Sequence, residues 1–345
     1  MTQAVPRWQA EDKPIALSMG EPAGIAAEIT LRAWQAFRDT NTVFFLLHDP
    51  DCMRAAAASL APQVPVRIIG DPRETSAVFR DALPVLPMVL PAAVVPGAID
   101  LRNSPAVIES IRRGVALAQN GEACALVTNP IQKSALYASG FDFPGHTEFL
   151  EHLAGEPFRS TMMLACQSLK VVPVTIHQSL ASAIAALTTT EIVAAALATA
   201  SAFRRDFGVE DPRLAIAGLN PHAGEDGTMG REEIEIIAPA VKELTAKGVR
   251  ATGPWAPDTM FTPRARLEYD AAICMYHDQA LIPLKTLDVD GGVNVTLGLP
   301  FVRTSPDHGT ALNLAGRGLA DPGSLIAALR MAAEIAAHRR TGDRT

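Results

Sequence analysis

The chain has few cysteines, few charged residues and no long uninterrupted apolar run in its 345 residues. The cysteines are far apart and include no Cys-x-x-Cys pair, which argues against a disulfide framework and against a thiolate metal site. The longest apolar stretch, 83–99, contains four prolines, so it cannot form an intact membrane-spanning helix. The N-terminal segment lacks the apolar core of a secretion signal. We therefore expect a reduced, cytoplasmic protein.

Charged residues make up 19% of the chain and hydrophobic residues 48%, which is typical of a folded globular protein and excludes a disordered one. The formal net charge is -7 and no dense run of lysine and arginine is present, which argues against a nucleic-acid partner. A negative net charge does not exclude an anionic substrate, because a site needs only a few local cations.

Strand-like and helix-like segments alternate along most of the chain. This alternation favours parallel sheets that are covered by helices on both faces, and the length is sufficient for two domains with sizeable cores. We therefore expect an α/β protein with two domains. The expected strands include 14–19, 43–47, 64–69 and 123–128, and the expected helices include 104–120, 188–207, 231–246 and 324–338.

Three histidines each follow an apolar, strand-like run: His177, His222 and His277. In an open α/β sheet, ligands bind beyond the carboxyl ends of the strands. Three imidazoles at such an edge can hold a divalent metal and leave coordination positions free for a substrate, and this ligand set suits Zn²⁺ among other metals. The alternative is three unrelated histidines that cap strands or bind loops, because the sequence alone does not show that they converge.

A second group of polar residues is suited to an anion. The segment 145–148 (Gly-His-Thr-Glu) opens a predicted helix, and helix N-termini attract phosphate or carboxylate. The alternative here is Thr147 as an ordinary N-cap. Arg303 lies among apolar residues, where an arginine is costly unless it is paired or faces a ligand, so a buried structural ion pair is the competing explanation. The further polar candidates are Lys285 and Asn294.

The segment 307–318 is a glycine-rich loop near the C-terminus. It does not contain the Gly-x-Gly-x-x-Gly fingerprint, and no such fingerprint follows an early strand, so a conventional Rossmann site is not expected. The alternative interpretation is a surface loop with turn glycines. The turn at 20–25 connects the first expected strand to a helix and is by itself weak evidence for a ligand.

Taken together, these segments resemble the 4-hydroxythreonine-4-phosphate dehydrogenase (PdxA) family, whose members are NAD-dependent enzymes of pyridoxal 5′-phosphate biosynthesis. The resemblance covers nearly the whole chain. It implies a fold similar to isocitrate and isopropylmalate dehydrogenases, with two α/β/α domains and a central cleft. Its most specific blocks are 145–149 (GHTEF), 218–225 (GLNPHAGE), 275–279 (MYHDQ), 294–300 (NVTLGLP) and 303–311 (RTSPDHGTA).

The resemblance also implies a domain division and a quaternary structure. We expect one discontinuous domain of 1–131 plus 298–345 that carries the NAD loop, and a second domain of 132–297 that carries the metal ligands and a dimer interface. The family forms homodimers with the active sites at the subunit interface. One metal ligand, most plausibly His277, is therefore expected to come from the partner subunit.

The resemblance implies a reaction and assigns residues to it. The reaction is oxidation, with decarboxylation, of 4-phosphooxy-L-threonine to 3-amino-2-oxopropyl phosphate with NAD, or NADP, and one divalent metal (Zn, Mg or Co). The expected metal ligands are His177, His222 and His277, and the candidates for the general base are Asp278 and Lys133. The expected substrate contacts are His146, Thr147, Lys285, Asn294 and Arg303. The expected dinucleotide contacts are His308, Gly309, Thr310, Ala311, Asn313 and Gly316.

The chain departs from the family pattern in two places. The early turn has Ala26 where the family usually has glycine, and the segment 128–132 before Lys133 lacks the family's common Gly-Pro. Related enzymes act on phosphorylated sugar acids such as 4-phospho-D-threonate and D-erythronate 4-phosphate, which are the alternative substrates. A metal-dependent phosphohydrolase and a non-catalytic metal or nucleotide sensor are the remote alternatives.

Overall fold

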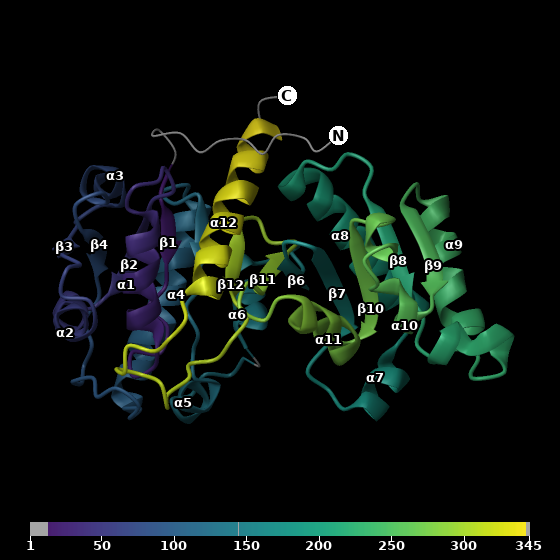
Figure 1. Cartoon of the computed structure of the whole chain (residues 1–345), viewed down its shortest axis with the longest axis horizontal. Coiled ribbons are helices and arrows are strands. Elements are labelled where there is room, and N and C mark those ends of the chain that lie inside the picture. The colour runs from purple at the N-terminus through teal and green to yellow at the C-terminus, as the bar shows by residue number, and fades with distance from the viewer. Residues whose placement is uncertain (1–12, 144, 343–345) are drawn as a thin grey trace. The chain divides into compact units, whose positions relative to one another are not determined.

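The computed structural model describes residues 13–143 and 145–342, which form two compact α/β units (Figure 1). The first unit holds the described residues of 13–160 and 299–342, and the second unit holds 161–298. The chain therefore leaves the first unit after residue 160 and returns to it after residue 298.

The first unit is built on a parallel sheet with the strand order β3-β4-β2-β1-β5-β12. On the central strand β1, Ile15 pairs with Phe44 of β2 on one side and with Ala125 of β5 on the other. Parallel pairing directs the carboxyl ends of all these strands to one edge of the sheet. The strands are β1 (Ile15–Leu17), β2 (Phe44–His48), β3 (Val66–Ile68), β4 (Leu83–Pro87), β5 (Ala125–Val127) and β12 (Arg303–Pro306).

Helices cover both faces of the first sheet. On one face, Ala16 and Leu126 share a core with Ile111 of α4 and Phe149 of α6. On the other face, α12 packs along β12 and β5, and α1 contacts α12 (Figure 1). The helices and short helical turns are α1 (Ala26–Phe37), α2 (Pro50–Leu60), η1 (Pro72–Glu74), α3 (Thr75–Val78), η2 (Leu101–Asn103), α4 (Ser104–Gln119), α5 (Lys133–Ala138), α6 (His146–Ala154) and α12 (Gly323–Gly342).

The first boundary between the units differs from the expected division after residue 131. Helices α5 and α6 both contact α4, and Leu136, Phe149 and Leu150 are fully buried in the core of the first unit. Phe149 also meets Phe141 edge-to-face, with ring centroids 5.0 Å apart. Because these apolar side chains are buried under α4, residues 132–160 belong to the first unit, and the next unit begins at β6.

The second unit contains a mixed sheet with the strand order β11-β6-β7-β10-β8-β9. Strands β7, β10, β8 and β9 are parallel, whereas β6 is antiparallel to both β7 and β11. Only Gln167 and Ser168 separate β6 from β7, and so short a connection permits only an antiparallel pair. The strands are β6 (Thr161–Cys166), β7 (Leu169–Thr175), β8 (Arg213–Ala217), β9 (Arg250–Trp255), β10 (Ala271–Tyr276) and β11 (Val293–Leu297).

The second unit is also covered by helices. α8 packs against β7 and β10, α9 packs against β9, and α11 packs against β7. The helices and helical turns are α7 (Leu180–Ala186), α8 (Thr189–Phe207), η3 (Pro221–Gly227), η4 (Glu233–Ile237), α9 (Ala238–Ala246), α10 (Pro257–Met260), η5 (Ala265–Leu267) and α11 (His277–Leu287).

The helix-covered strands of each unit confirm the predicted α/β fold class. Among the described residues, no single helix is long and apolar enough to cross a membrane, and only α7 and α8, taken together as a sharply bent pair, meet that length and composition.

The aromatic cluster of α6 provides a test of the unit boundary. We expect Phe149→Ala to destabilise the first unit by about 3–5 kcal/mol, because it leaves a cavity in a well-packed core. Urea unfolding measures the change, and Tyr137→Ala on the exposed side of α5 is the matched control. A loss below about 1 kcal/mol for Phe149→Ala would contradict the assignment of residues 132–160 to this core.

Candidate functional site

Arg303 is a buried cation at the start of β12. It is 2% exposed, and burial lowers the pKa of its guanidinium to about 9. Its Nη2 donates a hydrogen bond of 2.6 Å to Oγ1 of Thr128, which follows β5. A charge in such a place is costly, and an anionic ligand is one of the few partners that offset the cost.

His146, the first residue of α6, lies close enough to Arg303 and Lys133 to be affected by their charges. Burial, reinforced by the two cations, holds the pKa of His146 well below its ordinary value, so the imidazole is neutral. Its Nε2 is buried without a hydrogen-bond partner among the described residues. A neutral imidazole either donates or accepts a hydrogen bond according to its tautomer. The cluster thus offers two cations and one adaptable ring nitrogen.

The N-terminus of α6 adds backbone N–H groups to the same cluster. Gly145 is the N-cap and no side chain caps the helix, so the prediction of Thr147 as an ordinary N-cap is wrong. A Cβ at Gly145 would lie 3.2 Å from Nζ of Lys133 and 3.4 Å from a carboxylate oxygen of Glu148, so these two side chains lie close to the start of the helix. The uncapped N–H groups and the two cations together have the chemistry that suits an anion.

The expected dinucleotide loop is anchored within the first unit. Thr310 donates a hydrogen bond of 2.7 Å to Oε1 of Gln132, and its carbonyl accepts one from the N–H of Ile25. Gln132 belongs to the segment 128–132 that departs from the family pattern, and its side chain helps to hold the loop through this hydrogen bond. Ala311 has a left-handed backbone (φ 41°), and Nε2 of His308 is buried without a hydrogen-bond partner among the described residues.

The other expected dinucleotide contacts, Gly309, Asn313 and Gly316, lie on the same stretch after β12. A Cβ at Gly316 would lie 2.7 Å from Cβ of Pro96, so the loop packs closely on the segment that follows β4. The methyl group of Ala26 is buried beside Gly20, so the second departure from the family pattern is accommodated inside the turn.

In the second unit, the three histidines of the predicted metal site follow the carboxyl ends of three adjacent parallel strands, β7, β10 and β8. The rings of His177 and His277 lie together, with centroids 5.9 Å apart. They border a cavity of about 380 Å³ that residues 175–180 and 276–278 line. Asp278 lies 2.8 Å from Nδ1 of His277, which leaves Nε2 of that ring for a ligand.

His222 does not join this pair. Its ring is 58% exposed and hydrogen-bonds through Nδ1 to Glu225 at 2.7 Å, which raises its pKa. The described residues contain no group of three or more metal-binding side chains. The donor set therefore fits a divalent metal only in part: two imidazoles share one cavity, and the third nitrogen is not supplied by His222 in this structure.

The loop that carries His222 has an unusual backbone. Five consecutive residues, 222–226, have positive φ values between 40° and 79°, and only Gly224 among them is glycine. Each non-glycine residue in this region costs about 1 kcal/mol, so surrounding contacts must hold the loop.

Two buried side chains hold that loop; sequence reasoning missed Glu233, whereas Gln279 lies in the block 275–279 singled out above. Glu233 accepts hydrogen bonds from the N–H groups of Leu219 (2.7 Å) and Asn220 (2.8 Å) and from the side-chain amide of Asn220 (2.9 Å). Gln279 accepts from the N–H of Met275 (2.6 Å) and donates to the carbonyl of Gly218 (2.7 Å), which ties the end of β8 to the end of β10. The only sequence signal for Glu233 was its closeness to the block 218–225.

Lys285 and Asn294 also belong to the second unit. Lys285 lies on α11, eight residues after His277, and Asn294 lies on β11. Oδ1 of Asn294 is buried without a hydrogen-bond partner among the described residues. The structure thus divides the expected substrate residues: His146, Thr147 and Arg303 are in the first unit, and Lys285 and Asn294 are in the second.

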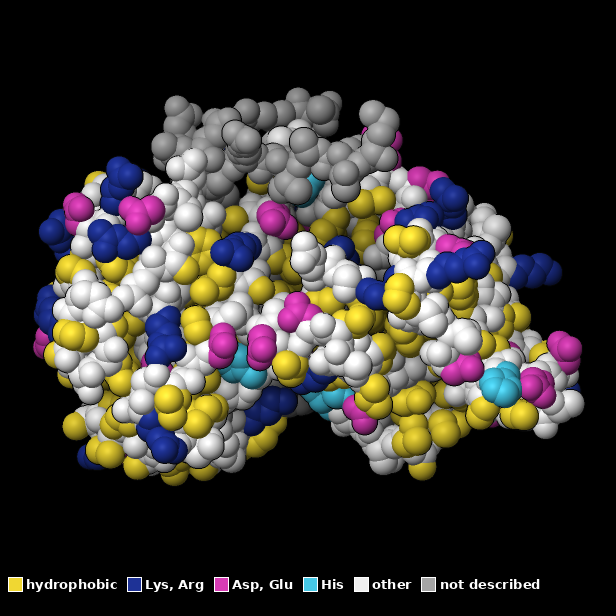
Figure 2. Space-filling model, in the orientation of Figure 1, with side chains coloured by type: hydrophobic (Ala, Val, Ile, Leu, Met, Phe, Trp, Pro, Cys, Tyr) yellow, Lys and Arg dark blue, Asp and Glu magenta, His cyan; other side chains and the backbone are white. Residues whose placement is uncertain are grey.

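Acidic and basic side chains are interspersed over the face drawn in Figure 2. The cations that lie near an uncapped helix N-terminus are Arg303 and Lys133. Two helix-covered α/β units, one with this cationic cluster and one with strand-end histidines, are features typical of an α/β enzyme that acts on a small anionic substrate.

Comparisons with known proteins identify the family. The chain belongs to the family described as the pyridoxal phosphate biosynthetic protein PdxA, whose family model matches residues 39–332, and this confirms the predicted resemblance. A 4-hydroxythreonine-4-phosphate dehydrogenase of Caulobacter vibrioides is 52% identical over 332 residues, which cover 95% of this chain and 98% of that protein. One of Bradyrhizobium diazoefficiens is 50% identical over 336 residues, covering 94% and 97%.

Solved structures agree with these relatives. The crystal structure of 4-hydroxythreonine-4-phosphate dehydrogenase from Klebsiella pneumoniae is similar with a TM-score of 0.84 and 38% identity, covering 94% of this chain and all of that one. A terephthalate 1,2-cis-dihydrodiol dehydrogenase from Burkholderia xenovorans is more distant, with a TM-score of 0.63, 28% identity and coverage of 94% and 98%.

Glu233 provides a pH-dependent test of the loop network. Burial tends to raise the pKa of this carboxyl, but the hydrogen bonds from Asn220 and Leu219 outweigh burial and lower it. Its stabilising contribution is therefore complete above the ordinary carboxyl pKa and is lost as the pH falls through the lowered value. We expect Glu233→Gln to cost about 1–3 kcal/mol at pH 7 and to flatten the loss of stability on acidification.

Urea unfolding between pH 7 and pH 3 measures both effects. Glu243→Gln, at an exposed position on α9, is the control and should follow the unsubstituted protein. Equal stability of Glu233→Gln and the unsubstituted protein at pH 7 would show that this carboxylate does not hold the loop.

Proposed function

We propose that the chain catalyses the NAD-dependent oxidation, with decarboxylation, of 4-phosphooxy-L-threonine to 3-amino-2-oxopropyl phosphate in pyridoxal 5′-phosphate biosynthesis. The observation that carries the proposal is the cluster of buried Arg303, exposed Lys133 and neutral His146 at the uncapped start of α6. Such a cluster suits a phosphate or carboxylate group. The relatives that cover nearly the whole chain bear the name of this activity.

The residues have separable roles in this proposal. Arg303 and Lys133 offset the negative charge of the substrate, and His146 supplies a hydrogen bond to it from a neutral ring. Lys285 and Asn294 are the contacts proposed from the second unit. The loop with His308, Gly309, Thr310, Ala311, Asn313 and Gly316 contacts the dinucleotide.

Oxidation of the substrate's alcohol needs a group that accepts the hydroxyl proton and contacts that hold the alcohol in place. Asp278 and Lys133 are the two candidates that accept the hydroxyl proton, and the hydrogen bond of Asp278 to His277 also orients that imidazole. Lys133 accepts a proton only in its uncharged form, in which case Arg303 alone offsets the charge of the substrate. When bound, NAD accepts the hydride and a divalent metal, Zn, Mg or Co, acts as a Lewis acid on the reacting oxygen. His177 and His277 would hold that metal.

The proposal also includes a homodimeric quaternary structure and a cytoplasmic location. A homodimer would complete the donor set, because among the described residues of one chain His177 and His277 come together without a third metal-binding side chain. The four thiols are all free, which supports a cytoplasmic location.

A substrate panel tests the proposed function. We expect NADH, followed at 340 nm, to form fastest with 4-phosphooxy-L-threonine when it is compared with 4-phospho-D-threonate and D-erythronate 4-phosphate. A preference for either sugar acid would replace the biosynthetic substrate and leave the reaction class standing. Release of phosphate without NADH would instead support a metal-dependent phosphohydrolase.

Arg303 provides a more specific test of the anion cluster. We expect Arg303→Lys to lower kcat/KM for the phosphorylated substrate by about 100-fold, because a lysine cannot reproduce the planar fork at a buried site. The KM for NAD should be nearly unchanged. Arg330→Lys, at an exposed position of α12, is the matched control. Unaltered kcat/KM in Arg303→Lys would remove the cluster from the substrate site.

Metal dependence is the last test of the proposed chemistry. We expect a chelator to abolish NADH formation and Zn²⁺, Mg²⁺ or Co²⁺ to restore it. His277→Ala should lose metal, measured by elemental analysis, while its circular dichroism stays unchanged. Full activity in a verified metal-free preparation would show that no metal takes part.

A further inference from the structure

The segment 128–132 connects the end of β5 to α5 and ends one residue before Lys133. Thr128 and Asn129 are fully buried and hydrogen-bonded, so the beginning of the segment is fixed. Gln132, at its end, is only half-buried. The contacts of the Gln132 side chain therefore determine how the chain enters α5.

The side chain of Gln132 connects α5 to the loop that follows β12. Its Oε1 accepts a hydrogen bond of 2.7 Å from the hydroxyl of Thr310, and its Nε2 donates one of 3.0 Å to Oγ of Ser134. Gln132 is the N-cap residue of α5, but its side chain caps none of the N–H groups of that helix. A helix of six residues is not stable by itself in water, so contacts of this kind fix its first turn. Gln132 and Ser134 flank Lys133, and the two hydrogen bonds thus hold the backbone on both sides of it.

Thr310 is a firm anchor for this contact. It is 6% exposed, and its carbonyl accepts a hydrogen bond of 3.1 Å from the N–H of Ile25. A Cβ at Gly24 would lie 2.8 Å from the same carbonyl oxygen, so the turn at 20–25 packs directly on the loop. The hydroxyl of Thr310 therefore has a fixed position from which to hold Gln132.

The turn, the loop and the segment 128–132 contact one another in pairs. The N–H of Glu21 in the turn donates a hydrogen bond of 2.8 Å to the carbonyl of Pro130, which joins the turn to the segment. The bond between Gln132 and Thr310 joins the segment to the loop. Loss of that one bond leaves the other two contacts in place, so a variant that lacks it is expected to fold.

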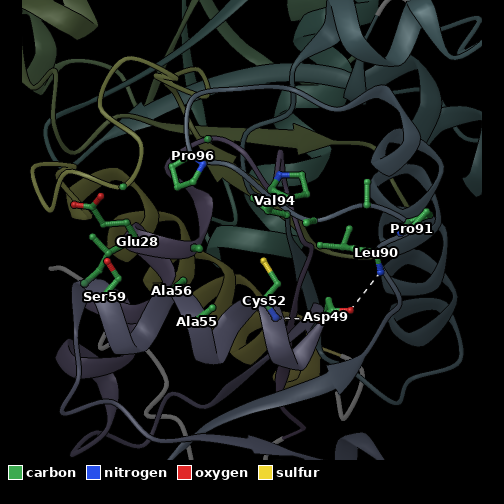
Figure 3. Close-up of a pocket in the computed structure, with 17 residues that line it drawn as sticks. Glu28, Asp49, Cys52, Ala55, Ala56, Ser59, Leu90, Pro91, Val94 and Pro96 are labelled. Atoms are coloured by element: carbon green, nitrogen blue, oxygen red, sulfur yellow. Dashed lines mark hydrogen bonds between the residues drawn. The ribbon is translucent and has the colours of Figure 1, made fainter.

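Part of the same loop borders open space. Gly316 of the loop and Gly24 of the turn line a cavity of about 540 Å³ beyond the carboxyl ends of β1, β2 and β4, and Pro96 and Glu28 are among its other lining residues (Figure 3). The charged residues of the lining, Glu28 and Asp49, are both acidic. The cavity supplies no cation to the anion cluster, and on that side the loop depends on its hydrogen bonds more than on packing.

Lys133 extends from the start of α5 toward the start of α6. A Cβ at Gly145 would lie 3.2 Å from its Nζ, and its charge lowers the pKa of His146. Lys133 is exposed and makes no hydrogen bond or ion pair with another described residue. A long side chain without such a contact keeps much of its rotamer freedom. The direction of the backbone at residue 133 therefore determines how well the side chain is aimed at the cluster.

We propose that Gln132 is a positioning residue that is anchored on Thr310 and aims Lys133 at the anion cluster. The inference rests on the proposed function, in which Lys133 is a cation for the substrate or the acceptor of its proton. Gln132 acts through Lys133 and does not itself contact the substrate.

Removing either partner of the hydrogen bond tests the proposal. Gln132→Met keeps the length of the side chain without the acceptor, Thr310→Val removes the donor, and Thr310→Ser keeps it. Titration calorimetry with inorganic phosphate measures the cluster without turnover or cofactor. We expect Gln132→Met and Thr310→Val each to raise the Kd for phosphate at least about threefold, and Thr310→Ser to restore it. Gln63→Met, at an exposed position between α2 and β3, is the matched control.

A second background shows whether Gln132 acts through Lys133. In Lys133→Met, the further change Gln132→Met should leave the Kd for phosphate unaltered, because the side chain that Gln132 aims is gone. Equal effects of Gln132→Met with and without Lys133 would overturn the proposal. An unchanged Kd for phosphate in Gln132→Met, together with a lower free energy of unfolding in urea, would show a bond that only holds the loop.

The phosphate titration also separates this inference from the proposed function. Weaker binding in Thr310→Val that Thr310→Ser restores supports the inference even when no substrate yields NADH, and this pair serves if Gln132→Met fails to fold. Absence of phosphate binding by the unsubstituted protein overturns the inference, whether or not NADH forms.

Discussion

Parallel strand pairing within each unit is the constraint on which the candidate sites depend. In the first unit, β1, β2, β4, β5 and β12 share one direction, so their carboxyl ends open at one edge. In the second unit, β7, β10 and β8 share one direction and are followed by the three histidines. Residues that are distant in the sequence lie near one another because parallel pairing places the carboxyl ends of these strands at the same edge of the sheet.

Charge then divides the first unit into two chemically different places. Arg303, Lys133 and the start of α6 form a positive environment, which reinforces the burial that keeps His146 neutral. The cavity beyond β1, β2 and β4 has only carboxylates among its charged lining residues. One sheet edge therefore offers a cationic place that attracts an anion and an acidic place that repels one.

Periodicity and strand-end chemistry in the sequence were sufficient to predict the α/β class and the placement of the histidines after adjacent strands. They could not predict that α5 and α6 pack under α4, because apolar residues such as Phe149 carry no information about which sheet they cover. The sequence also could not predict that His222 lies apart from His177 and His277. Residues 222–226 have a left-handed backbone, but Gly224 is the only glycine among them, so the composition of the loop does not indicate that conformation.

The strained loop 222–226 depends on the side chains that hold it in place. Left-handed conformations at His222, Ala223 and Glu225 would relax unless another interaction opposed the change. Glu233 satisfies the two N–H groups before the loop, and Gln279 ties the preceding carbonyl to β10, where His277 follows. The hydrogen bonds of Glu233 and Gln279 thus hold a conformation that the loop would not adopt alone. The position of His222 therefore depends on the buried carboxylate of Glu233.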